Sequence, residues 1–321
     1  MSLGALERSL RARLRGRVEA ERPLAGLTTY RLGGPARLYV EPADPADVDA
    51  LADALRDAPG VPLLVLGRGS NVVVSDGGWP GIALRLGPAF AWIEPLEVAD
   101  APGGLRAGAG TPLPTLANWA ARRGLSGLEF LVAIPGSVGG AVRMNAGAHG
   151  GAVADTLCGA RVADLARAAI AERAAGDLDL GYRRSNLASH DVVLDATFAL
   201  RADDGSAIRA RMDEYRRHRA ATQPGALQNA GSVFRNPPGD AAGRLVEAAG
   251  LKGWRVGGAC VADLHANFFI ADPGAAAQDV FDLVEGVAER VRSLFGVELE
   301  PEIRFAGAFA RSGRPLEPSG R

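Results

Sequence analysis

The sequence predicts a mixed α/β protein of more than one domain, and three observations support this. The length of 321 residues exceeds what one hydrophobic core usually serves. The run VPLLVLG, residues 61–67, is a short apolar segment typical of a buried strand, and it follows a helical pattern in residues 44–60. A second helical pattern, residues 275–296, has one apolar face made of Val280, Val284, Val287, Val291 and Leu294.

The first part of the chain predicts a small α/β unit that ends near Leu86. Its helix over 44–60 begins with Asp44 as N-cap and Pro45 at the first helical position. The arginine-rich segment 6–23 predicts a short amphipathic helix, because it has acidic residues and no apolar core of a signal peptide. Strands are expected at residues 36–42, 61–67, 71–76 and 81–86.

The pattern changes after Phe90, which indicates a second region. Short strands (91–99, 105–110), a helix (114–124), a glycine-rich segment (126–151) and a closing strand (192–201) are expected there. A charged helix (209–224), a shorter helix (241–250) and strands at 256–262 and 267–272 follow. The predicted division is therefore 1–86, 87–205, 206–310 and a tail, 311–321.

Composition limits the classes of function. The formal net charge of −1 gives no field for nucleic acid or an anionic membrane, and no apolar run is long enough to span one. Cys158 and Cys260 lie far apart, which favours a reducing compartment and hence the cytoplasm. The four histidines share no metal-ligand spacing, so we expect no metal site, and no obligate protein partner is evident.

Three glycine-rich segments could hold a phosphate-bearing cofactor. In GRGSN, Gly67 and Gly69 would allow backbone N–H groups to face an anion, and Ser70 and Asn71 would add side-chain hydrogen bonds. This segment lacks the lysine of a P-loop and the third glycine of a dinucleotide fingerprint. An ordinary turn remains the alternative for this loop.

The other two segments are IPGSVGGAVRMNAGAHG, residues 134–150, and TTYRLGGPA, residues 28–36. The first has too many glycines for a packed element and would wrap around a large flat ligand; a structural hairpin is its alternative. Three such loops in one half of the chain favour one bound cofactor over three independent turns.

Ser232 lies in NAGSVFRNP, residues 229–237. By its spacing alone, a serine after Ala-Gly is more often a turn or cap residue than a catalytic one. Gly231 would nevertheless leave room for close approach of a ligand, and Asn236-Pro237 would end the element so that the serine stays at its edge.

Several segments together resemble the UDP-N-acetylenolpyruvoylglucosamine reductase (MurB) family. They are TTYRLGG, GRGSNVVVSDGGWPG, GLEFLVAIPGSVGGAVRMNAGAHG, GYRRS, NAGSVFRNP, GLKGWRVGGACVADLHANFF and LEPEIRF. The resemblance covers about Leu24 to Phe305 and is similar to the second type of the family, without an extra substrate loop. It implies an α+β and α/β fold, with an FAD-binding region of two subdomains like that of vanillyl-alcohol oxidase and a C-terminal α+β substrate domain.

The resemblance also implies a reaction, in which NADPH reduces non-covalently bound FAD, and hydride then adds to the enol ether of UDP-N-acetylglucosamine enolpyruvate. Arg183 would hold the substrate carboxylate, Ser232 would donate a proton to the carbanionic carbon, and Glu302 would act in its protonated form. Glu300 is the rival of Glu302, since it lies two residues away and could share its strand face.

Further positions carry over from the family as binding residues. The cofactor would contact Thr29, Tyr30, Gly67, Arg68, Gly69, Ser70, Asn71, Ile134, Pro135, Gly136, Ser137, Gly139, Gly140, Asn145 and Gly147. The UDP-sugar would contact Tyr182, Arg235, Asn236, His265 and Asn267. The chain departs from the family at Arg235, where lysine is usual, at His149, where tyrosine is common, and at Leu187-Ala188.

Two other functions are weighed against this one. A different flavoprotein oxidase or dehydrogenase of the same fold would explain the first half of the chain, but not AGSVFRNP and PEIRF together. A non-catalytic flavin or nucleotide regulator predicts loss of Arg183, Ser232 or Glu302, and all three are present. Arg216, Arg217 and Arg219 could bind a diphosphate or form a solvated helix face, and Glu129 could be a helix-end carboxylate.

Overall fold

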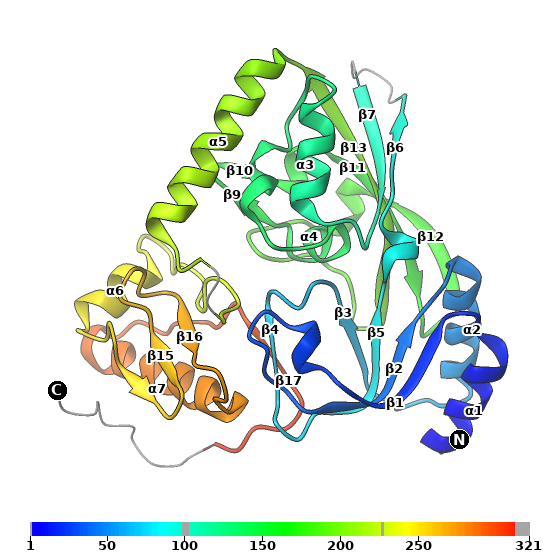
Figure 1. Cartoon of the computed structure of the whole chain (residues 1–321), viewed down its shortest axis with the longest axis horizontal. Coiled ribbons are helices and arrows are strands. Elements are labelled where there is room, and N and C mark those ends of the chain that lie inside the picture. The colour runs from blue at the N-terminus through cyan, green and yellow to red at the C-terminus, as the bar shows by residue number, and fades with distance from the viewer. Residues whose placement is uncertain (1, 98–102, 226–227, 312–321) are drawn as a thin grey trace. The chain divides into compact units, whose positions relative to one another are not determined.

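The computed structural model describes residues 2–97, 103–225 and 228–311, and its contacts group the chain into two compact units (Figure 1). Unit 1 contains Met1–Glu21, Leu38–Arg68 and Gly81–Arg219. Unit 2 contains Arg22–Arg37, Gly69–Pro80 and Ala220–Arg321. Two short N-terminal segments therefore group with the C-terminal part, so these units do not follow the linear order of the chain. The division into domains expected above stays a prediction. Residues 312–321 of the expected tail lie outside the described residues.

The first sheet of unit 1 has the strand order β1-β2-β5-β3, and helices α1 and α2 contact each other beside it (Figure 1). Its core includes apolar side chains of both helices and of β2 and β5. The elements are α1 (Leu3–Arg13), β1 (Arg17–Pro23), β2 (Pro35–Glu41), α2 (Pro45–Arg56), β3 (Leu63–Leu66) and β5 (Trp79–Arg85). The 3-10 helix η1 (Ala25–Leu27), between β1 and β2, belongs to unit 2. The predicted cap of α2 is confirmed, because the Asp44 side chain accepts a hydrogen bond from Asp47 N.

The N-terminal helix is shorter than expected, because the chain turns at Gly16. A Cβ at Gly16 would lie 2.2 Å from Glu41 O. The buried carboxylate of Asp47 accepts hydrogen bonds from Arg15 N at 3.0 Å and Gly16 N at 2.8 Å. The segment after this turn is strand β1, not helix. The prediction of a helix through residue 23 was wrong. Asp47 lies 32 residues from Arg15 and 31 from Gly16 in the sequence, so no local pattern could reveal this turn.

Strand β3 is parallel to β5 and lies at the edge of its sheet. Leu63 to Val65 are only partly buried, so the expectation that this run is covered on both faces was wrong. An edge strand has a neighbour on one side alone, and its apolar residues are shielded less than those of a central strand.

The second sheet of unit 1 has the order β12-β11-β13-β7-β6, with β8 paired to β13. Helices α3 and α4 and the 3-10 helix η3 pack with it around a core separate from the first. The elements are η2 (Pro88–Phe90), β6 (Ile93–Leu96), β7 (Gly103–Gly108), α3 (Leu113–Ala121), β8 (Leu125–Ser126), η3 (Glu129–Ala133), α4 (Val138–Met144), β9 (Gly147–Ala148), β10 (Gly151–Ala152), η4 (Val153–Asp155), β11 (Leu157–Asp164), β12 (Ala169–Ala174), η5 (Ala175–Leu178) and β13 (Asp191–Ala202).

Part of the glycine-rich segment is helical, contrary to expectation. Gly139 and Gly140 lie within α4, and a Cβ at Gly139 would lie 2.9 Å from Ala109 Cβ. Glycine is used here because the helix packs closely against the residue that follows β7. Helix α5 (Gly205–Thr222) then leaves unit 1, and its end, Ala220–Thr222, belongs to unit 2.

Unit 2 is built around helix α7, which packs against the small sheet β14-β15-β16 (Figure 1). Its elements are β4 (Val72–Val74), α6 (Ala242–Ala248), β14 (Arg255–Val256), β15 (Ala259–Val261), β16 (Phe269–Ala271), α7 (Ala277–Phe295) and β17 (Arg304–Ala306). The four valines predicted on the inner face of α7 are buried. Leu294 is 47% exposed, so its placement on that face was wrong; it lies in the last turn, where the core ends.

Two segments far apart in the sequence join unit 2 together. Strand β4 pairs in parallel with β17, with Val72 opposite Arg304 and Val74 opposite Ala306. The Asp76 carboxylate accepts hydrogen bonds from Ala277 N at 2.9 Å and Gln278 N at 3.1 Å, and so caps α7. The segment Gly69–Pro80 is therefore fastened to the C-terminal elements at two places.

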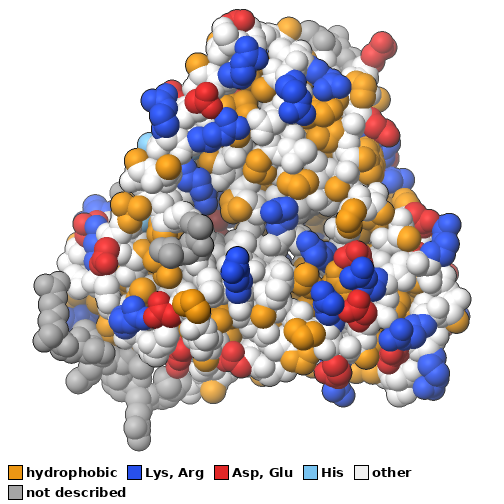
Figure 2. Space-filling view, viewed as in Figure 1, with side chains coloured by type: hydrophobic (Ala, Val, Ile, Leu, Met, Phe, Trp, Pro, Cys, Tyr) orange, Lys and Arg blue, Asp and Glu red, His pale blue; other side chains and the backbone are white. Residues whose placement is uncertain are grey.

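No helix in the described parts of the chain is long and apolar enough to cross a membrane. On the face shown in Figure 2, arginine side chains are interspersed with acidic ones, as the net charge of −1 suggests.

Candidate functional site

Ser232 begins a segment that is hydrogen-bonded along both edges in unit 2. On one side, Ser232 pairs with Phe268, and Val233 N donates to Asn267 O at 2.8 Å. On the other side, Arg235 N donates to Glu300 O at 2.9 Å, and Glu302 N donates to Val233 O at 2.7 Å. Glu302 is therefore fixed opposite Val233, the residue next to Ser232.

The turn before Ser232 is made by another side chain. Gly231 has a φ of 77°, and its N–H donates to Asn229 Oδ1 at 3.0 Å. Asn229 thus fills the role of turn residue that spacing alone suggested for Ser232. The Ser232 hydroxyl makes no hydrogen bond within the described part of the chain, and the residue is only partly buried. It is therefore available to a ligand.

Two of the predicted cofactor loops are hydrogen-bonded to residues next to the Ser232 segment. Asn71 Nδ2 donates to Glu302 O at 3.1 Å, and Arg304 N donates to Asn71 O at 3.1 Å. The Thr29 hydroxyl lies 2.6 Å from Asn229 O, and Thr29 N donates to Gly69 O at 3.0 Å. Loops 28–34 and 69–71 are therefore bonded to the residues that position Ser232 and Glu302.

Arg183 lies in a tight turn of unit 1. Gly181 and Arg184 exchange backbone hydrogen bonds, and Arg183 has a φ of 55°, in the left-handed region. Its Nη2 donates to Gly147 O at 3.0 Å, in the predicted cofactor loop. Arg184 Nη2 instead lies 3.2 Å from Asp179 Oδ1 at the surface. Tyr182 is 56% exposed, with the Arg183 guanidinium 5.1 Å from its ring centre.

Two side chains that precede this turn in the sequence hold it. The Asn145 amide donates to Gly181 O at 3.0 Å and accepts from Ala154 N at 2.9 Å. Arg143 was not predicted, yet its guanidinium donates to the carbonyl oxygens of Leu187, Ala188 and Asp191. Because these contacts are to backbone atoms, the departure from the family at Leu187-Ala188 does not affect them. Only the position of Arg143 inside the glycine-rich segment could have suggested this role.

Two predicted cofactor loops of unit 1 lie against each other. A Cβ at Gly67 would lie 2.5 Å from the Ser137 hydroxyl oxygen, so the two predicted loops touch here. At the start of α4, the N–H groups of Val138 and Gly139 donate to the carbonyl oxygens of Thr111 and Ala109. Only glycine at position 67 lets the Ser137 hydroxyl approach this backbone so closely.

Two of the predicted contact residues have side chains that are buried and hydrogen-bonded within the protein. Tyr30 is fully buried in the core of unit 2, and its hydroxyl donates to Phe269 O at 2.9 Å. Burial, with the nearby Cys260, raises its pKa. Asn267 is also buried, with both ends of its amide bonded to Phe234. The side chains of these two residues are therefore in the core and not at a ligand surface.

Other predicted substrate residues lie at the surface of unit 2. Asn236 Oδ1 accepts from Ala242 N at 3.0 Å at the start of α6, which leaves its NH₂ group for a ligand. Arg235 Nη1 lies 3.3 Å from Glu300 Oε2, while its buried Nε has no partner in the described residues. His265 Nδ1 accepts from Asn267 N at 3.1 Å, and burial, with the charge of Lys252, lowers the pKa of His265. The imidazole is therefore neutral near pH 7.

The three predicted catalytic residues are thus distributed over both units. Unit 2 brings together Ser232, Glu302, Asn71 and Thr29 through backbone bonds. Unit 1 brings together Arg183 and Gly147. Glu300, the rival of Glu302, is 75% exposed and paired with Arg235.

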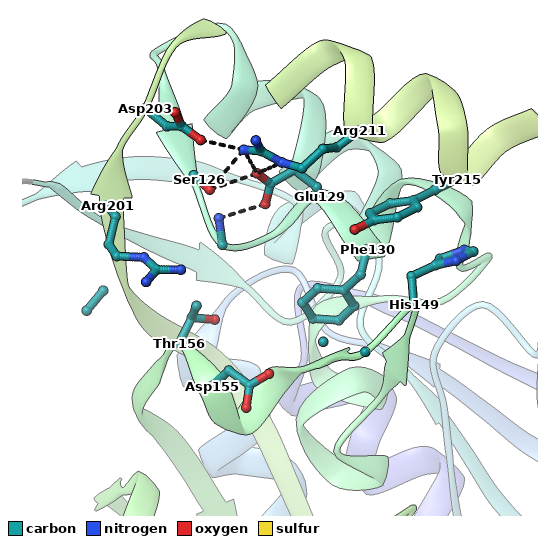
Figure 3. A pocket seen from close by; sticks show the side chains of 14 residues that line it. Ser126, Glu129, Phe130, His149, Asp155, Thr156, Arg201, Asp203, Arg211 and Tyr215 are labelled. Atoms are coloured by element: carbon teal, nitrogen blue, oxygen red, sulfur yellow. Dashed lines mark hydrogen bonds and ion pairs between the residues drawn. The ribbon is translucent and has the colours of Figure 1, made fainter. Parts of the chain in front are cut away.

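Unit 1 also contains a hollow of about 710 Å³ that includes none of the predicted site residues (Figure 3). At its upper edge, Arg211 contacts Glu129, Ser126 and Asp203, with 2.7 Å between Arg211 Nη2 and Glu129 Oε1. Burial opposes the charge of Glu129, but bonds from Arg211, Gly127 N and Ser126 lower its pKa overall. Glu129 is thus a structural carboxylate.

Another side of this hollow contains one of the departures from the family, His149. The His149 ring stacks on Tyr215 of α5, with 4.2 Å between the ring centres. Burial and the neighbours His218 and Arg219 lower the pKa of His149. Farther along α5, Arg216 and Arg217 are exposed and bonded to Asp213. These two arginines thus lie on a solvated helix face, which was the alternative to binding a diphosphate.

One group in unit 1 has the residue types of a metal site: Asp164, His190 and Asp191. Both carboxylates are already paired with arginines, Asp164 with Arg167 at 2.8 Å and Asp191 with Arg173 at 3.2 Å. Both carboxylates are buried, and because arginines neutralise their charge, the group is an ion-pair network.

Comparisons with known proteins found two family models that match parts of this chain. Residues 223–306 match the family model for the C-terminal domain of UDP-N-acetylenolpyruvoylglucosamine reductase, and residues 36–172 match the FAD binding domain. The chain is 43% identical over 295 residues to the enzyme of that name from Sphingopyxis alaskensis, covering 92% of this chain and 96% of the relative. The Acidiphilium cryptum enzyme is 45% identical over 294 residues, or 92% and 93% of the two chains.

A solved structure shows the same fold. The crystal structure of UDP-N-acetylenolpyruvylglucosamine reductase from Thermus caldophilus aligns with a TM-score of 0.74 at 36% identity, covering 92% of this chain and all of that one.

Proposed function

The chain belongs to the UDP-N-acetylenolpyruvoylglucosamine reductase family, and from that membership we propose how its own residues divide the catalytic work. As a member it is an FAD-dependent oxidoreductase that uses NADPH to reduce UDP-N-acetylglucosamine enolpyruvate to UDP-N-acetylmuramate, a precursor of peptidoglycan. The residues of unit 1 and unit 2 supply different parts of this reaction.

When bound at the predicted cofactor residues, FAD would supply a hydride for the terminal carbon of the substrate's double bond. The electron pair of that bond moves to the adjacent carbon and its carboxylate. We assign Arg183 to this carboxylate, since a guanidinium can bind it through two hydrogen bonds and neutralise the charge that develops in the transition state. Its bond to Gly147 O and its cation–π contact with Tyr182 orient it for this role.

Ser232 is assigned the proton transfer. Its hydroxyl donates a proton to the carbanionic carbon, which completes the addition of H⁻ and H⁺ across the double bond, and the alkoxide then takes a proton from water. A hydroxyl is a weak acid, so it serves only when it is held within hydrogen-bonding distance of a strongly basic carbon. The observation that carries this assignment is that Asn229 makes the turn, while the Ser232 hydroxyl has no hydrogen bond among the residues that the structure describes.

Glu302 is assigned to the same reacting centre. Its backbone is bonded to Val233 O and to Asn71 Nδ2, so it is held beside Ser232 and at the GRGSN loop. A protonated carboxyl group there would stabilise the enolate-like intermediate without repelling the substrate carboxylate. The exposed Tyr182 and Asn236 and the partly buried Arg235 and His265 are assigned to binding the UDP-sugar.

The test separates the two half-reactions of the holoenzyme. In Ser232→Ala, we expect NADPH to bleach the flavin at the normal rate under anaerobic conditions. Recovery of the yellow colour on addition of the enol ether should slow by about 10²- to 10⁴-fold, the range for loss of a proton donor. Ser293→Ala, an exposed serine of α7 in the same unit, should leave both rates unchanged. Equal, fast rates for both half-reactions in Ser232→Ala would contradict the assignment.

We also propose that the protein acts in the cytoplasm, where NADPH and UDP-sugars are present. Its two cysteines, which form no disulfide, are compatible with this compartment. The expectation that it needs no obligate protein partner remains a prediction.

A further inference from the structure

Asn267 is a buried amide whose two ends bond the backbone of one residue. Its Oδ1 accepts from Phe234 N at 2.9 Å, and its Nδ2 donates to Phe234 O at 2.8 Å. Asn267 is 3% exposed, and Phe234 is 1% exposed. The side chain therefore bonds Phe234 as a neighbouring strand would.

The position of Phe234 explains why an amide is needed there. On the side of residues 300–303, Phe234 is paired with Pro301. This is the non-hydrogen-bonded kind of antiparallel pair, in which the two opposed residues do not bond each other's backbone. The N–H and C=O groups of Phe234 therefore point to the other side, where Asn267 lies. Both groups are buried, and an unpaired buried N–H or C=O is strongly unfavourable. Asn267 satisfies both with one side chain.

Asn267 is in turn held by its own loop. Its N–H donates to His265 Nδ1 at 3.1 Å, and its carbonyl oxygen accepts from Val233 N at 2.8 Å. A Cβ at Gly243 of α6 would lie 3.6 Å from Asn267 Cβ, so the helix covers this side chain. A direct contact between the Asn267 amide and substrate, as expected from the sequence, is not compatible with this covering and with its two bonds.

We propose that Asn267 is a positioning residue that fixes the Ser232 hydroxyl for proton transfer by clamping the backbone of the following two residues. This inference rests on the proposed role of Ser232. A serine side chain has a single rotatable bond before its oxygen, so any shift of its backbone moves the hydroxyl by a similar distance. A misplacement of about 1 Å at a reacting group can slow a reaction roughly 10²-fold.

The most informative variant is Asn267→Asp, which has nearly the same shape. Its carboxyl group can still accept from Phe234 N, but it can donate to Phe234 O only while protonated. Facing a carbonyl oxygen in a buried place, the new carboxyl will have a pKa above the value of about 3.9 for a free aspartate. The clamp is then intact at pH values below this raised pKa and is lost as pH rises through it.

We therefore expect the rate of flavin reoxidation by the enol ether, relative to wild type at each pH, to be near one at low pH. It should fall about 10²-fold at pH 8. Flavin reduction by NADPH and the flavin absorbance spectrum should stay as in wild type at every pH. A relative reoxidation rate that does not change with pH would overturn the proposal, since the clamp would then have no effect on the proton transfer.

A second variant and a control separate positioning from general loss of stability. In Asn267→Ala, hydrogen exchange measured by mass spectrometry should speed up in the peptide that contains Val233 to Arg235, and reoxidation should slow at all pH values. Asp279→Ala removes hydrogen bonds to Gly258 N and Ala276 N in the same unit, away from Ser232. It should lower the melting temperature without changing the reoxidation rate; an equal slowing in both variants would show that Asn267 acts only through stability.

The two proposals fail in distinguishable ways. If Ser232→Ala reoxidises at the wild-type rate, the proton-donor assignment itself is wrong. If Ser232→Ala is slow but the Asn267 variants are not, the assignment stands and the positioning role of Asn267 is wrong.

Discussion

The Arg183 turn of unit 1 and the Ser232 segment of unit 2 are held in different ways. Arg183 lies in a left-handed backbone conformation, and its guanidinium is bonded to Gly147 O. Ser232 precedes a segment with backbone or amide bonds along both of its edges. The reach of the side chain explains this difference. A contact at the guanidinium can fix the position of a long arginine side chain. The position of a serine hydroxyl, in contrast, depends directly on the position of its backbone.

The two regions also share one feature, a buried asparagine whose side-chain amide bonds backbone groups. Asn145 bonds Gly181 O and Ala154 N beside the Arg183 turn, as Asn267 bonds Phe234 in the Ser232 segment. An asparagine amide carries one donor side and one acceptor side, like a peptide group, and can therefore satisfy both backbone groups. In both segments an asparagine side chain therefore bonds the backbone of another segment.

The largest effect in this comparison is expected for the arginine. Arg183→Ala should slow flavin reoxidation by the enol ether about 10³-fold, because charge on the substrate carboxylate would lose its stabilisation in the transition state. Arg183→Lys should be intermediate, since an ammonium keeps the charge but cannot bind the carboxylate as a planar fork. Arg184→Ala is the matched control, and stopped-flow absorbance of the flavin is the measurement. Equal losses at positions 183 and 184 would show that the turn, and not the guanidinium of Arg183, is required.

The next effect distinguishes the two glutamates near the Ser232 segment. Glu302→Gln should slow reoxidation about 10²-fold if its carboxyl group supplies or shares a proton. Glu300→Gln should change the rate little, because that side chain is 75% exposed and contacts Arg235. Both changes leave the backbone pairing with Val233 and Arg235 in place. A larger loss at position 300 would reverse the choice between them.

A smaller effect is expected at the predicted cofactor loops of unit 1. Gly67→Ala would place a methyl group 2.5 Å from the Ser137 hydroxyl oxygen. Overpacking of this kind costs about 1–3 kcal/mol, so FAD should bind roughly tenfold more weakly or worse. Gly176→Ala has open space around its new Cβ and is the control. The measurement is the dissociation constant for FAD added to the apoprotein; unchanged affinity in Gly67→Ala would exclude this loop from the cofactor site.

The smallest effect concerns stability and not catalysis. Glu129→Gln should lower the free energy of unfolding by about 1 kcal/mol at pH 7, because Arg211 loses a charged partner. The pKa of Glu129 is lowered in the folded state, so its contribution is complete above the unfolded pKa of about 4.3 and is lost as pH falls through the folded pKa. Urea denaturation at pH 7 and near pH 3 measures this difference. A gap between variant and wild type that does not shrink at the lower pH would contradict the structural role of Glu129.

Much of the fold was predictable from short stretches of sequence. Asp44 and Pro45 mark the start of α2, and the spacing of Val280, Val284, Val287 and Val291 gives the buried face of α7. These predictions succeed because caps and helical faces depend on residues within a few positions of one another. The family motifs, quoted in order along the chain, likewise identified the reductase family and its cofactor from the sequence.

Only the tertiary structure decided how the site is held. The turn at Gly16, the exposure of β3 and the pairing of β4 with β17 each depend on partners distant in the sequence. Asn71 and Glu302 are 231 residues apart, and Asn267 is 33 residues from Phe234. An asparagine in a motif looks the same whether its amide contacts a ligand or a buried backbone. The sequence by itself determined which candidate residues are present. Long-range hydrogen bonds, which no local pattern encodes, decided which of their side chains are already bonded to the backbone.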